Sequence, residues 1–367
     1  MRQAVCPRAE PPMSARSRDR RVYLRSHPLL FALLSATRPL RLVRLGRTVL
    51  VHDPAAYREI LTNVPLDREA EGTTGGSAAR LAGGGMLFDQ VGEQHRDARR
   101  SLAAELGAAG VARLRPIWQD VIERGLAALP GPVDLVPLAK DIAGATACAL
   151  TRCPADPRTL AEAAIAAATE AAHEHLPGRR GRAQADRARQ AVDRLSALLP
   201  EPLDAMLAVA AVNTTVAALP RAAAWCARAG LWDEVSPDLV RELLRLLAPT
   251  PLLPRVAAAD AVIQAGRKEF QVRTSDRLVL VARHAAESHR DTAADPQAAA
   301  QAVFGAGSHA CPGANLARAQ LADFLAALVP HHPSVRRARP AHETALPGYA
   351  RLVVEGRIID GRIRICA

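Results

Sequence analysis

Residues 304–313 read Phe-Gly-Ala-Gly-Ser-His-Ala-Cys-Pro-Gly, a glycine-rich loop that presents one thiol, Cys311, directly before a strongly helical run that begins at Ala314. Glycines beside the sulfur let the backbone come close to a flat group. The N-terminus of the following helix supplies N–H groups and a positive dipole end, which favour an anionic thiolate. The pattern predicts a ligating thiolate, and its alternative is a structural cysteine buried in a tight turn.

Composition and periodicity predict a mainly α protein with a small β region. The chain has 367 residues, of which 49% are hydrophobic and only 3% aromatic, so Ala, Leu and Val must build the core, which favours closely packed helices. Alternating apolar residues predict a hairpin over 40–51 and strands within 250–285. Helical patterns cover 93–106, 110–128, 134–152, 157–175, 183–199, 202–229, 236–248 and 313–329.

Two segments lack the pattern of a regular element. Residues 1–20 are polar and rich in proline, so we expect a disordered tail, followed by a single domain over residues 21–367. Residues 71–86 contain six glycines, which predicts a loop.

Charge and cysteine usage narrow the class of protein. The net charge is +11, but the arginines are spread along the chain, which argues against nucleic-acid binding and favours an acidic protein partner. The six cysteines show neither zinc-site spacing nor a disulfide framework, which indicates a reducing cytoplasm. The apolar run 29–35 is far shorter than the roughly 20 residues that cross a bilayer, so no membrane is expected.

The cysteine loop resembles that of the cytochrome P450 family, Phe-Gly-x-Gly-x-His-x-Cys-x-Gly, a specific pattern. The resemblance implies the cytochrome P450 fold, haem b as cofactor and Cys311 as the axial ligand of its iron. The matching positions are Phe304, Gly305, Gly307, His309, Cys311 and Gly313.

Glu242 and Arg245 lie three residues apart on one predicted helical face. Alone they indicate a solvated surface pair. Their position before Pro251-Leu-Leu-Pro-Arg255 matches the Glu-x-x-Arg helix and following strand of the same family. The resemblance implies a buried pair that holds the cysteine-bearing core together.

His95 and Arg99 lie four residues apart, so both can reach one anionic group, although an exposed basic helix has the same pattern. The segment resembles the cytochrome P450 helix that binds the haem propionates. Arg255 and His309 match two further propionate contacts of that family. Four such groups around two carboxylates make physical sense because buried charges need partners.

The segment 208–215 matches the oxygen-activation helix of the family, although a Thr-Thr pair within a helix is usually neutral packing. Thr214 keeps the hydroxyl, but Asn213 stands where the family has an acid. Asparagine can orient water but cannot cycle a proton. The expected catalytic pair is Thr214 and Asn213, with proton delivery through ordered water.

Substrate contacts are expected after the glycine-rich loop and on the oxygen helix. The basic connection 176–184 favours a solvated loop, with contact to an anionic substrate as the alternative. The segment before Phe304 is shorter than the family's, which affects partner docking and haem retention. The candidate substrate contacts are Met86, Leu87, Phe88, Met206, Val209 and Ala210.

The resemblance implies a bacterial-type monooxygenase that tailors a small-molecule secondary metabolite. It implies electrons from NAD(P)H through a ferredoxin-type partner, and an anionic sulfur that assists O–O cleavage. Two alternatives remain. One is a peroxide-driven or radical-coupling enzyme without oxygen insertion, suggested by Asn213. The other is a catalytically silent scaffold or activator, against which the intact cysteine loop argues.

Overall fold

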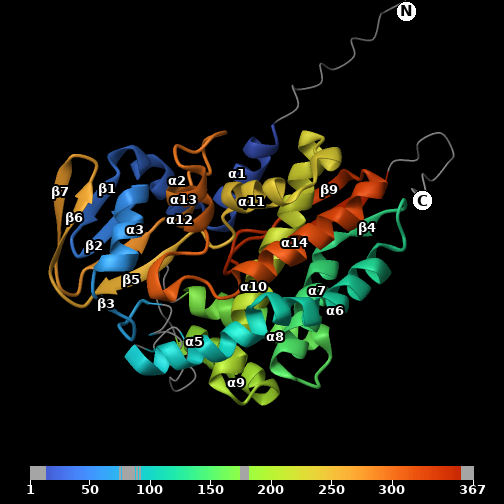
Figure 1. The fold of residues 1–367 in the computed structure, drawn as a ribbon, viewed down its shortest axis with the longest axis horizontal. Helices are drawn as coiled ribbons and strands as arrows, with labels where there is room; N and C mark the ends of the chain where they lie inside the picture. Colours follow the sequence, from blue (N-terminus) through green and yellow to red (C-terminus); the bar gives the residue numbers. More distant parts are fainter. Residues whose placement is uncertain are drawn as a thin grey trace, which may run out of the picture.

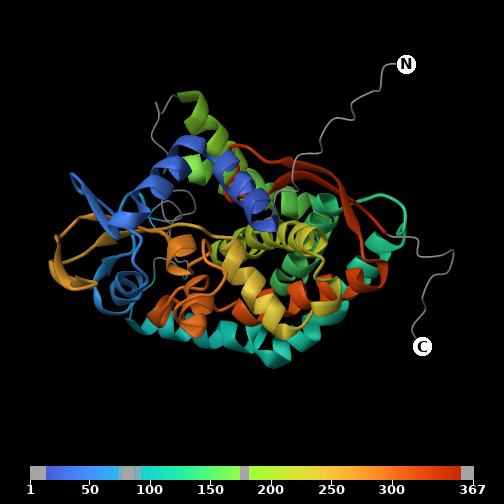
Figure 2. The same cartoon turned by 90° about the horizontal axis from the view of Figure 1, so that it is seen from above.

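The computed structural model describes residues 14–73, 76, 87, 90, 92–173 and 182–356. Helices form most of the body, and strands β1–β3 and β5–β8 gather at one end of it (Figure 1). Seen from above, helices α5 and α6 run along one long edge, and the hairpin β9–β10 lies on the side away from strands β6 and β7 (Figure 2). The long helix α10 passes through the middle of the molecule in both views.

The helices agree closely with the predicted ones from residue 92 onward. They are α1 (Ala15–Ser26), α2 (Pro28–Thr37), α3 (Pro54–Asn63), α5 (Gly92–Leu106), α6 (Ala108–Leu126), α7 (Leu135–Thr151), α8 (Pro157–His173), α9 (Arg182–Leu198), α10 (Pro202–Ala229), α11 (Pro237–Leu247), α12 (Ala282–Ala285), α13 (Pro296–Ala302) and α14 (Ala314–Leu328).

Local sequence signals fix many helix ends. Asp53, Asp134 and Ser236 each accept a hydrogen bond from a backbone N–H of the first turn that follows. Proline occupies the first position of α10, where no helical N–H bond is lost. Gly230 ends the same helix with a φ of 69°, the left-handed conformation that glycine adopts most readily.

The strands form three sheets. The five-stranded sheet has the order β1-β2-β8-β5-β3, in which β2 and β8 are parallel and the other pairs antiparallel. The predicted strands within 250–285 are confirmed as β5 to β8. The strands are β1 (Leu42–Leu45), β2 (Thr48–Val51), β3 (Leu66–Asp67), β4 (Val133–Asp134), β5 (Leu253–Ala257), β6 (Ala261–Ala265), β7 (Lys268–Val272), β8 (Arg277–Leu280), β9 (Ser334–Pro340) and β10 (Tyr349–Glu355).

Small side chains let α7, α8 and α10 pack closely. Ala143, Ala164 and Ala208 are at most 1% exposed, and a Cβ added to Gly144 would lie 2.0 Å from the carbonyl oxygen of Pro157. Among the described residues, α10 alone is long and apolar enough to cross a membrane, and half of its apolar window is buried in the protein. Its apolar composition is explained by this position in the core.

The prediction that residues 1–20 are disordered is wrong for residues 15–20, which belong to α1. The carboxylate of Asp19 is buried and accepts hydrogen bonds from Arg221 and Arg283, each at 2.9 Å. Both guanidiniums also donate to the carbonyl of Leu247. These contacts fasten the helix to the core, whereas residues 1–13 lie outside the described part of the chain.

Candidate functional site

The cysteine loop folds back on itself through one short hydrogen bond. The N–H of Cys311 donates to the carbonyl of Phe304 at 2.7 Å. Gly305 and Gly307 have φ angles of 76° and 71°, which favour glycine at both positions. A Cβ on Gly307 would also lie 2.8 Å from the carbonyl oxygen of Leu61, so this part of the loop is pressed against the end of α3.

The Cys311 residue is solvent-accessible, yet surrounding protein removes enough water that desolvation raises the pKa of its thiol. The backbone N–H of Gly313 and the charges of Arg99 and Arg318 lower that pKa. These three groups stabilise a thiolate over a thiol. A Cβ at Gly313 would come within 3.8 Å of the sulfur, so glycine keeps one side of it open.

The aromatic ring of Phe304 contacts one of the two arginines that lower the pKa of the Cys311 thiol. The guanidinium carbon of Arg318, on the first turns of α14, lies 4.6 Å from the ring centroid. This cation–π contact holds the arginine near the sulfur. The predicted residues Phe304, Gly313 and Cys311 therefore lie together with a cation that the sequence did not single out.

His95 of α5 stacks on His309 of the cysteine loop, with ring centroids 3.8 Å apart and planes inclined by 24°. Burial, followed by the charges of Arg99 and Arg68, lowers the pKa of His95. Burial and neighbouring basic groups, Arg68 first, lower the pKa of His309 to about 3. Both rings are therefore neutral near pH 7, and the Nε2 atom of His95 is buried without a hydrogen-bond partner.

Two arginines lie beside these histidines. Arg255 is on β5, and Arg68 directly follows β3, the strand that pairs with β5. Burial lowers the pKa of Arg255, and burial together with the charge of Arg255 lowers the pKa of Arg68 to about 10. The Nη1 atom of Arg255 donates to the carbonyl of Pro254 at 2.7 Å, but the Nε atom of Arg255 is buried without a hydrogen-bond partner. No carboxylate contributes to these pKa values within the described part of the chain.

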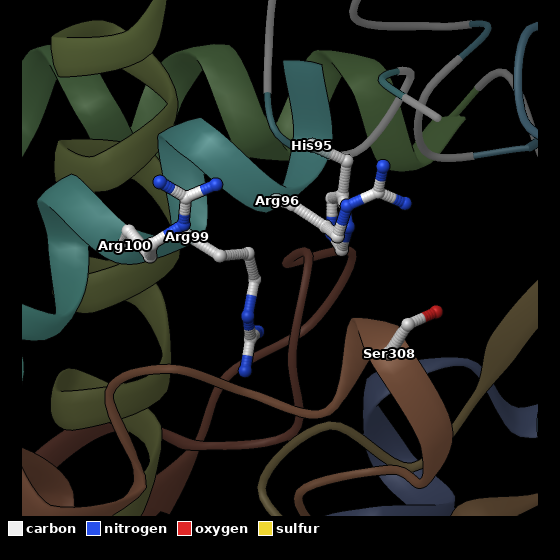
Figure 3. A pocket seen from close by; sticks show the side chains of 5 residues that line it. All are labelled: His95, Arg96, Arg99, Arg100 and Ser308. Atoms are coloured by element: carbon white, nitrogen blue, oxygen red, sulfur yellow. The ribbon is translucent and has the colours of Figure 1, made fainter. Parts of the chain in front are cut away.

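Figure 3 shows this side of the site, where α5 faces the cysteine loop. The guanidinium of Arg99 points from the helix toward the loop and donates a hydrogen bond to the carbonyl of Ala310. An open hollow of about 350 Å³ lies here, between α5, β3 and the loop. Its lining residues are Leu66, Arg68, Gly92, His95, Arg96, Ser308 and His309.

We call His95, Arg99, Arg68, Arg255 and His309 the basic cradle. Two of its buried nitrogen atoms have no partner, and the charges of its arginines lower the pKa of His95, His309 and Arg68. Such a group fits a bound dianion, because buried cations and donors need an anionic partner. The two propionates of haem meet this requirement, and Cys311 supplies the thiolate that haem iron takes. The residues present therefore fit haem.

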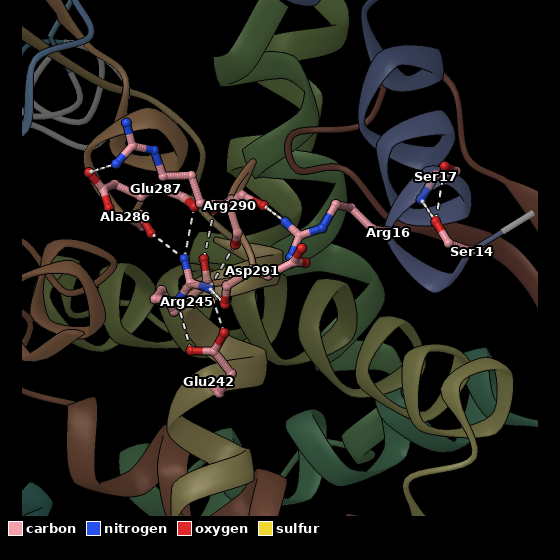
Figure 4. A network of polar contacts seen from close by, with 10 residues as sticks. Ser14, Arg16, Ser17, Glu242, Arg245, Ala286, Glu287, Arg290 and Asp291 are labelled. Atoms are coloured by element: carbon pink, nitrogen blue, oxygen red, sulfur yellow. Dashed lines mark hydrogen bonds and ion pairs between the residues drawn. The ribbon is translucent and has the colours of Figure 1, made fainter. Parts of the chain in front are cut away.

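Glu242 and Arg245 form the predicted ion pair on α11, through two hydrogen bonds (Figure 4). The Arg245 side chain is 1% exposed, whereas that of Glu242 is 39% exposed. Arg245 also donates to the carbonyls of four residues at 2.8–3.2 Å, which ties α11 to the chain after α12. Those residues are Ala286, Glu287, Arg290 and Asp291.

The expected catalytic pair lies at mid-length of α10. The hydroxyl of Thr214 donates to the carbonyl of Ala210, one turn earlier, at 2.8 Å. The side-chain amide of Asn213 donates to Val209 at 2.8 Å and to Ala164 of α8 at 3.3 Å. Asn213 therefore links α10 to α8.

A buried polar chain that the sequence did not suggest joins three helices. The hydroxyl of Thr215 donates to Gln320 of α14 at 3.3 Å, and the amide of Gln320 donates to Thr146 of α7 at 2.8 Å. Only the tertiary fold brings these residues together. Arg68 was missed for the same reason, since it reaches the cradle through the pairing of β3 with β5.

The candidate substrate contacts differ in how deeply they are buried and in which helices they contact. Leu87 and Met206 are buried in the main hydrophobic cluster, at 4% and 5% exposure. Val209 and Ala210 are partly buried on α10, and Val209 packs toward α8 and α9. Met86, Phe88 and most of the connection 176–184 lie outside the described residues.

Comparison with known proteins identifies the fold. No protein-family model and no curated protein matches the sequence. Solved cytochrome P450 structures do match. A Mycobacterium marinum cytochrome P450 in complex with pseudoionone has a TM-score of 0.71 and 17% identity, covering 96% of this chain and all of its own. A six-coordinated cytochrome P450 from Thermus thermophilus has a TM-score of 0.70 and 19% identity, covering 90% of this chain and 98% of its own.

A third structure with a similar fold is that of an enzyme whose activity is known. The mycinamicin VIII C21 methyl hydroxylase of Micromonospora griseorubida, bound to mycinamicin VIII, has a TM-score of 0.67 and 20% identity, covering 90% of this chain and 97% of its own. At these identities the likeness concerns the fold.

Proposed function

We propose that this chain, which has the fold of the cytochrome P450s, is a haem-thiolate monooxygenase that acts on a small molecule. One observation carries the proposal. Cys311, with three groups that favour its thiolate, shares a site with a basic cradle whose buried nitrogens lack an anion. A structural cysteine in a turn needs neither feature.

Bound haem would supply iron that activates dioxygen, and a thiolate ligand would increase its capacity for O–O cleavage. The chain's own residues set up that chemistry. Gly313, Arg99 and Arg318 favour the thiolate form of Cys311 and oppose the desolvation that raises its pKa. His95, Arg255 and His309 would hold the propionates, together with Arg99 and Arg68, and would so orient the cofactor.

Thr214, with Asn213, organises proton delivery from α10. The Thr214 hydroxyl can donate to its own helix or turn toward a water, and so can pass a hydrogen bond onward. The Nδ2 group of Asn213 donates to two backbone carbonyls, so the Oδ1 atom of the same side chain can accept a hydrogen bond from water. Neither residue supplies an ionisable proton, so the proton comes from solvent through ordered water.

The substrate is a small secondary metabolite, by analogy with the hydroxylase of mycinamicin VIII. Leu87, Met206, Val209 and Ala210 offer apolar contact, as do Met86 and Phe88. Electrons come from NAD(P)H through an acidic ferredoxin-type protein in the cytoplasm. Arg96 and Arg100 on α5 are exposed near the hollow, and each can exchange its ion pair with Glu93 or Asp97 for one with an acidic partner.

A second candidate is a peroxide-driven or radical-coupling enzyme without oxygen insertion. It is favoured by the two hydrogen bonds that occupy the Asn213 amide where an acid would cycle a proton. Product formation with hydrogen peroxide, but not with a ferredoxin, its reductase and NAD(P)H, would select this candidate.

The first experiment is the absorption spectrum of the purified, reduced protein under carbon monoxide. We expect a strongly red-shifted Soret band that is absent from Cys311→Ala. Cys226→Ala, which removes a buried thiol in the core, is the matched control and should keep the band. A band unchanged by loss of Cys311, or no haem at all, would refute the proposal and favour a silent scaffold or activator.

A further inference from the structure

Two cysteines meet at the C-terminal end of α7. The N–H of Cys153 donates to the carbonyl of Cys148 at 2.9 Å, and Arg152 between them has a φ of 54°. This is the hydrogen bond of a Schellman motif, which brings a residue in the last helical turn against the residue that directly follows the left-handed one. That contact is normally hydrophobic. In this chain a thiol occupies both positions.

The two thiols lie close enough that Cys153 is one of the influences that raise the pKa of Cys148. The sulfur of Cys148 donates to the carbonyl of Ala155, and that of Cys153 to the carbonyl of Leu198, each at 3.5 Å. Both residues are only partly buried, so a small reagent can reach them, unlike Cys226, which is fully buried.

We propose that Cys148 and Cys153 form a redox-active dithiol that closes reversibly to a disulfide across the end of α7. The oxidant is a low-molecular-weight disulfide such as glutathione disulfide. The proposal does not depend on haem binding, because both thiols belong to the α7–α8–α9 layer. It adds a modification site to a chain whose only other proposed cysteine chemistry is at Cys311.

Cys153 is the attacking sulfur. Burial, and then the neighbouring Cys153, raise the pKa of Cys148 to about 11, so the Cys148 thiol is a poor first nucleophile near pH 7. Deprotonated Cys153 attacks glutathione disulfide, forms a mixed disulfide and releases one glutathione. Cys148 then loses its proton, attacks the Cys153 sulfur and releases the second glutathione. Two protein thiols are oxidised to one disulfide, and one glutathione disulfide is reduced to two thiols.

Closure has a structural consequence at α9. A disulfide has no S–H group, so the carbonyl of Leu198, the last residue of α9, loses its donor. The turn between α7 and α8 becomes constrained, because the new bond closes a short loop. Oxidation should therefore rigidify one end of α8 and free the end of α9, which packs against it.

The cleavage pattern of trypsin gives a direct test. Arg152 lies between the two cysteines, so cleavage after it places them on separate peptides that stay joined only by a disulfide. The purified full-length protein is equilibrated in glutathione buffers of increasing oxidised fraction, alkylated, digested and analysed by mass spectrometry. We expect the linked pair to increase with the oxidised fraction and to return to alkylated cysteines after reduction.

Cys153→Ser should abolish the linked pair, and Cys226→Ala should leave it unchanged. Alkylated cysteines or mixed glutathione disulfides alone, at every buffer ratio, would overturn the proposal. In hydrogen exchange, faster exchange at the end of α9 after oxidation would support the structural consequence, and unchanged exchange would refute it.

Discussion

His95 and His309 stack face to face, with 3.8 Å between ring centroids, although one belongs to helix α5 and the other to the cysteine loop. Two imidazolium ions would repel each other in this arrangement, and burial together with nearby arginines keeps both rings neutral. The protein thus gathers hydrogen-bond donors and arginines in one place, and among the described residues no carboxylate contributes to the pKa values of Arg68, Arg255 and His309. An anionic cofactor would supply the missing charge.

Arg255→Met should stabilise the haem-free protein and weaken haem binding. The guanidinium is buried with an unpartnered Nε, so its removal relieves a desolvation cost. Loss of a charged hydrogen bond to a propionate should lower haem affinity about 10- to 100-fold. Haem transfer to apomyoglobin measures the affinity, and urea unfolding measures the stability.

Arg277→Met is the matched control, because Arg277 is exposed on the neighbouring strand β8. It should change neither quantity appreciably. Equal haem affinity in Arg255→Met and the original chain would contradict a propionate role for Arg255.

Arg245→Leu should destabilise the protein far more than Glu242→Gln. Removing the buried guanidinium leaves several carbonyls and a carboxylate without their donor, with an expected loss of about 3–5 kcal/mol. The 39% exposed Glu242 can exchange its contact for water, so Glu242→Gln should cost about 1 kcal/mol. Urea unfolding of both variants measures the difference, and equal losses would show that the pair acts as one unit.

Asn213→Asp should destabilise the protein although it restores the acid that the family has at this position. The amide donates to the carbonyls of Val209 and Ala164, and a carboxylate would face both oxygens without a proton to share. We expect a loss of about 1–3 kcal/mol in the free energy of unfolding near pH 7. Thr214→Val, which removes a bond within the same helix, should cost less. A fully stable Asn213→Asp variant would show that the tie to α8 is unimportant.

Stability should fall as the pH drops below about 6.5, in part through His52 and His284. Their Nδ1 atoms lie 2.8 Å apart in the core, and burial lowers the pKa of His52 to about 4 and that of His284 to about 2. In the unfolded chain both titrate near 6.5. Between these values the unfolded state binds protons that the native state does not, so stability is present above pH 6.5 and is lost as the pH falls.

The expected slope is roughly 1.4 kcal/mol per pH unit for each histidine. His284→Gln should flatten the dependence between pH 6.5 and 4 by about one proton, as measured by urea unfolding at several pH values. His342→Gln, at an exposed position, is the control. An unchanged slope in His284→Gln would contradict the buried, neutral state of this residue.

Most of the helical body could be predicted from local signals. The helix over 202–229 was predicted to the residue, because a proline at its first position and a glycine after its last mark both ends. Helix α1 was missed because its sequence is polar. Its burial depends on Asp19 meeting arginines about 200 residues away, which no local pattern contains.

In the candidate site, too, some residues could be predicted from local motifs and others only from the tertiary fold. The motifs predicted that His95, Arg99, Arg255 and His309 act together, and the structure brings them to one region with Cys311. Arg68 and Gln320 could not be predicted in this way. Each follows from a pairing of distant elements, β3 with β5 and α10 with α14, that the fold alone determines.

The Asp19 carboxylate has a practical consequence for shortened versions of this protein. It is the shared counter-charge of Arg221 and Arg283, which are only 2% and 7% exposed in the folded protein. Trimming the N-terminus past residue 19, to remove a polar-looking leader for crystallisation, would leave two guanidiniums in the core without a neutralising group. Such a product should misfold or aggregate, so expression boundaries are better placed before Ser14, the residue that caps this helix.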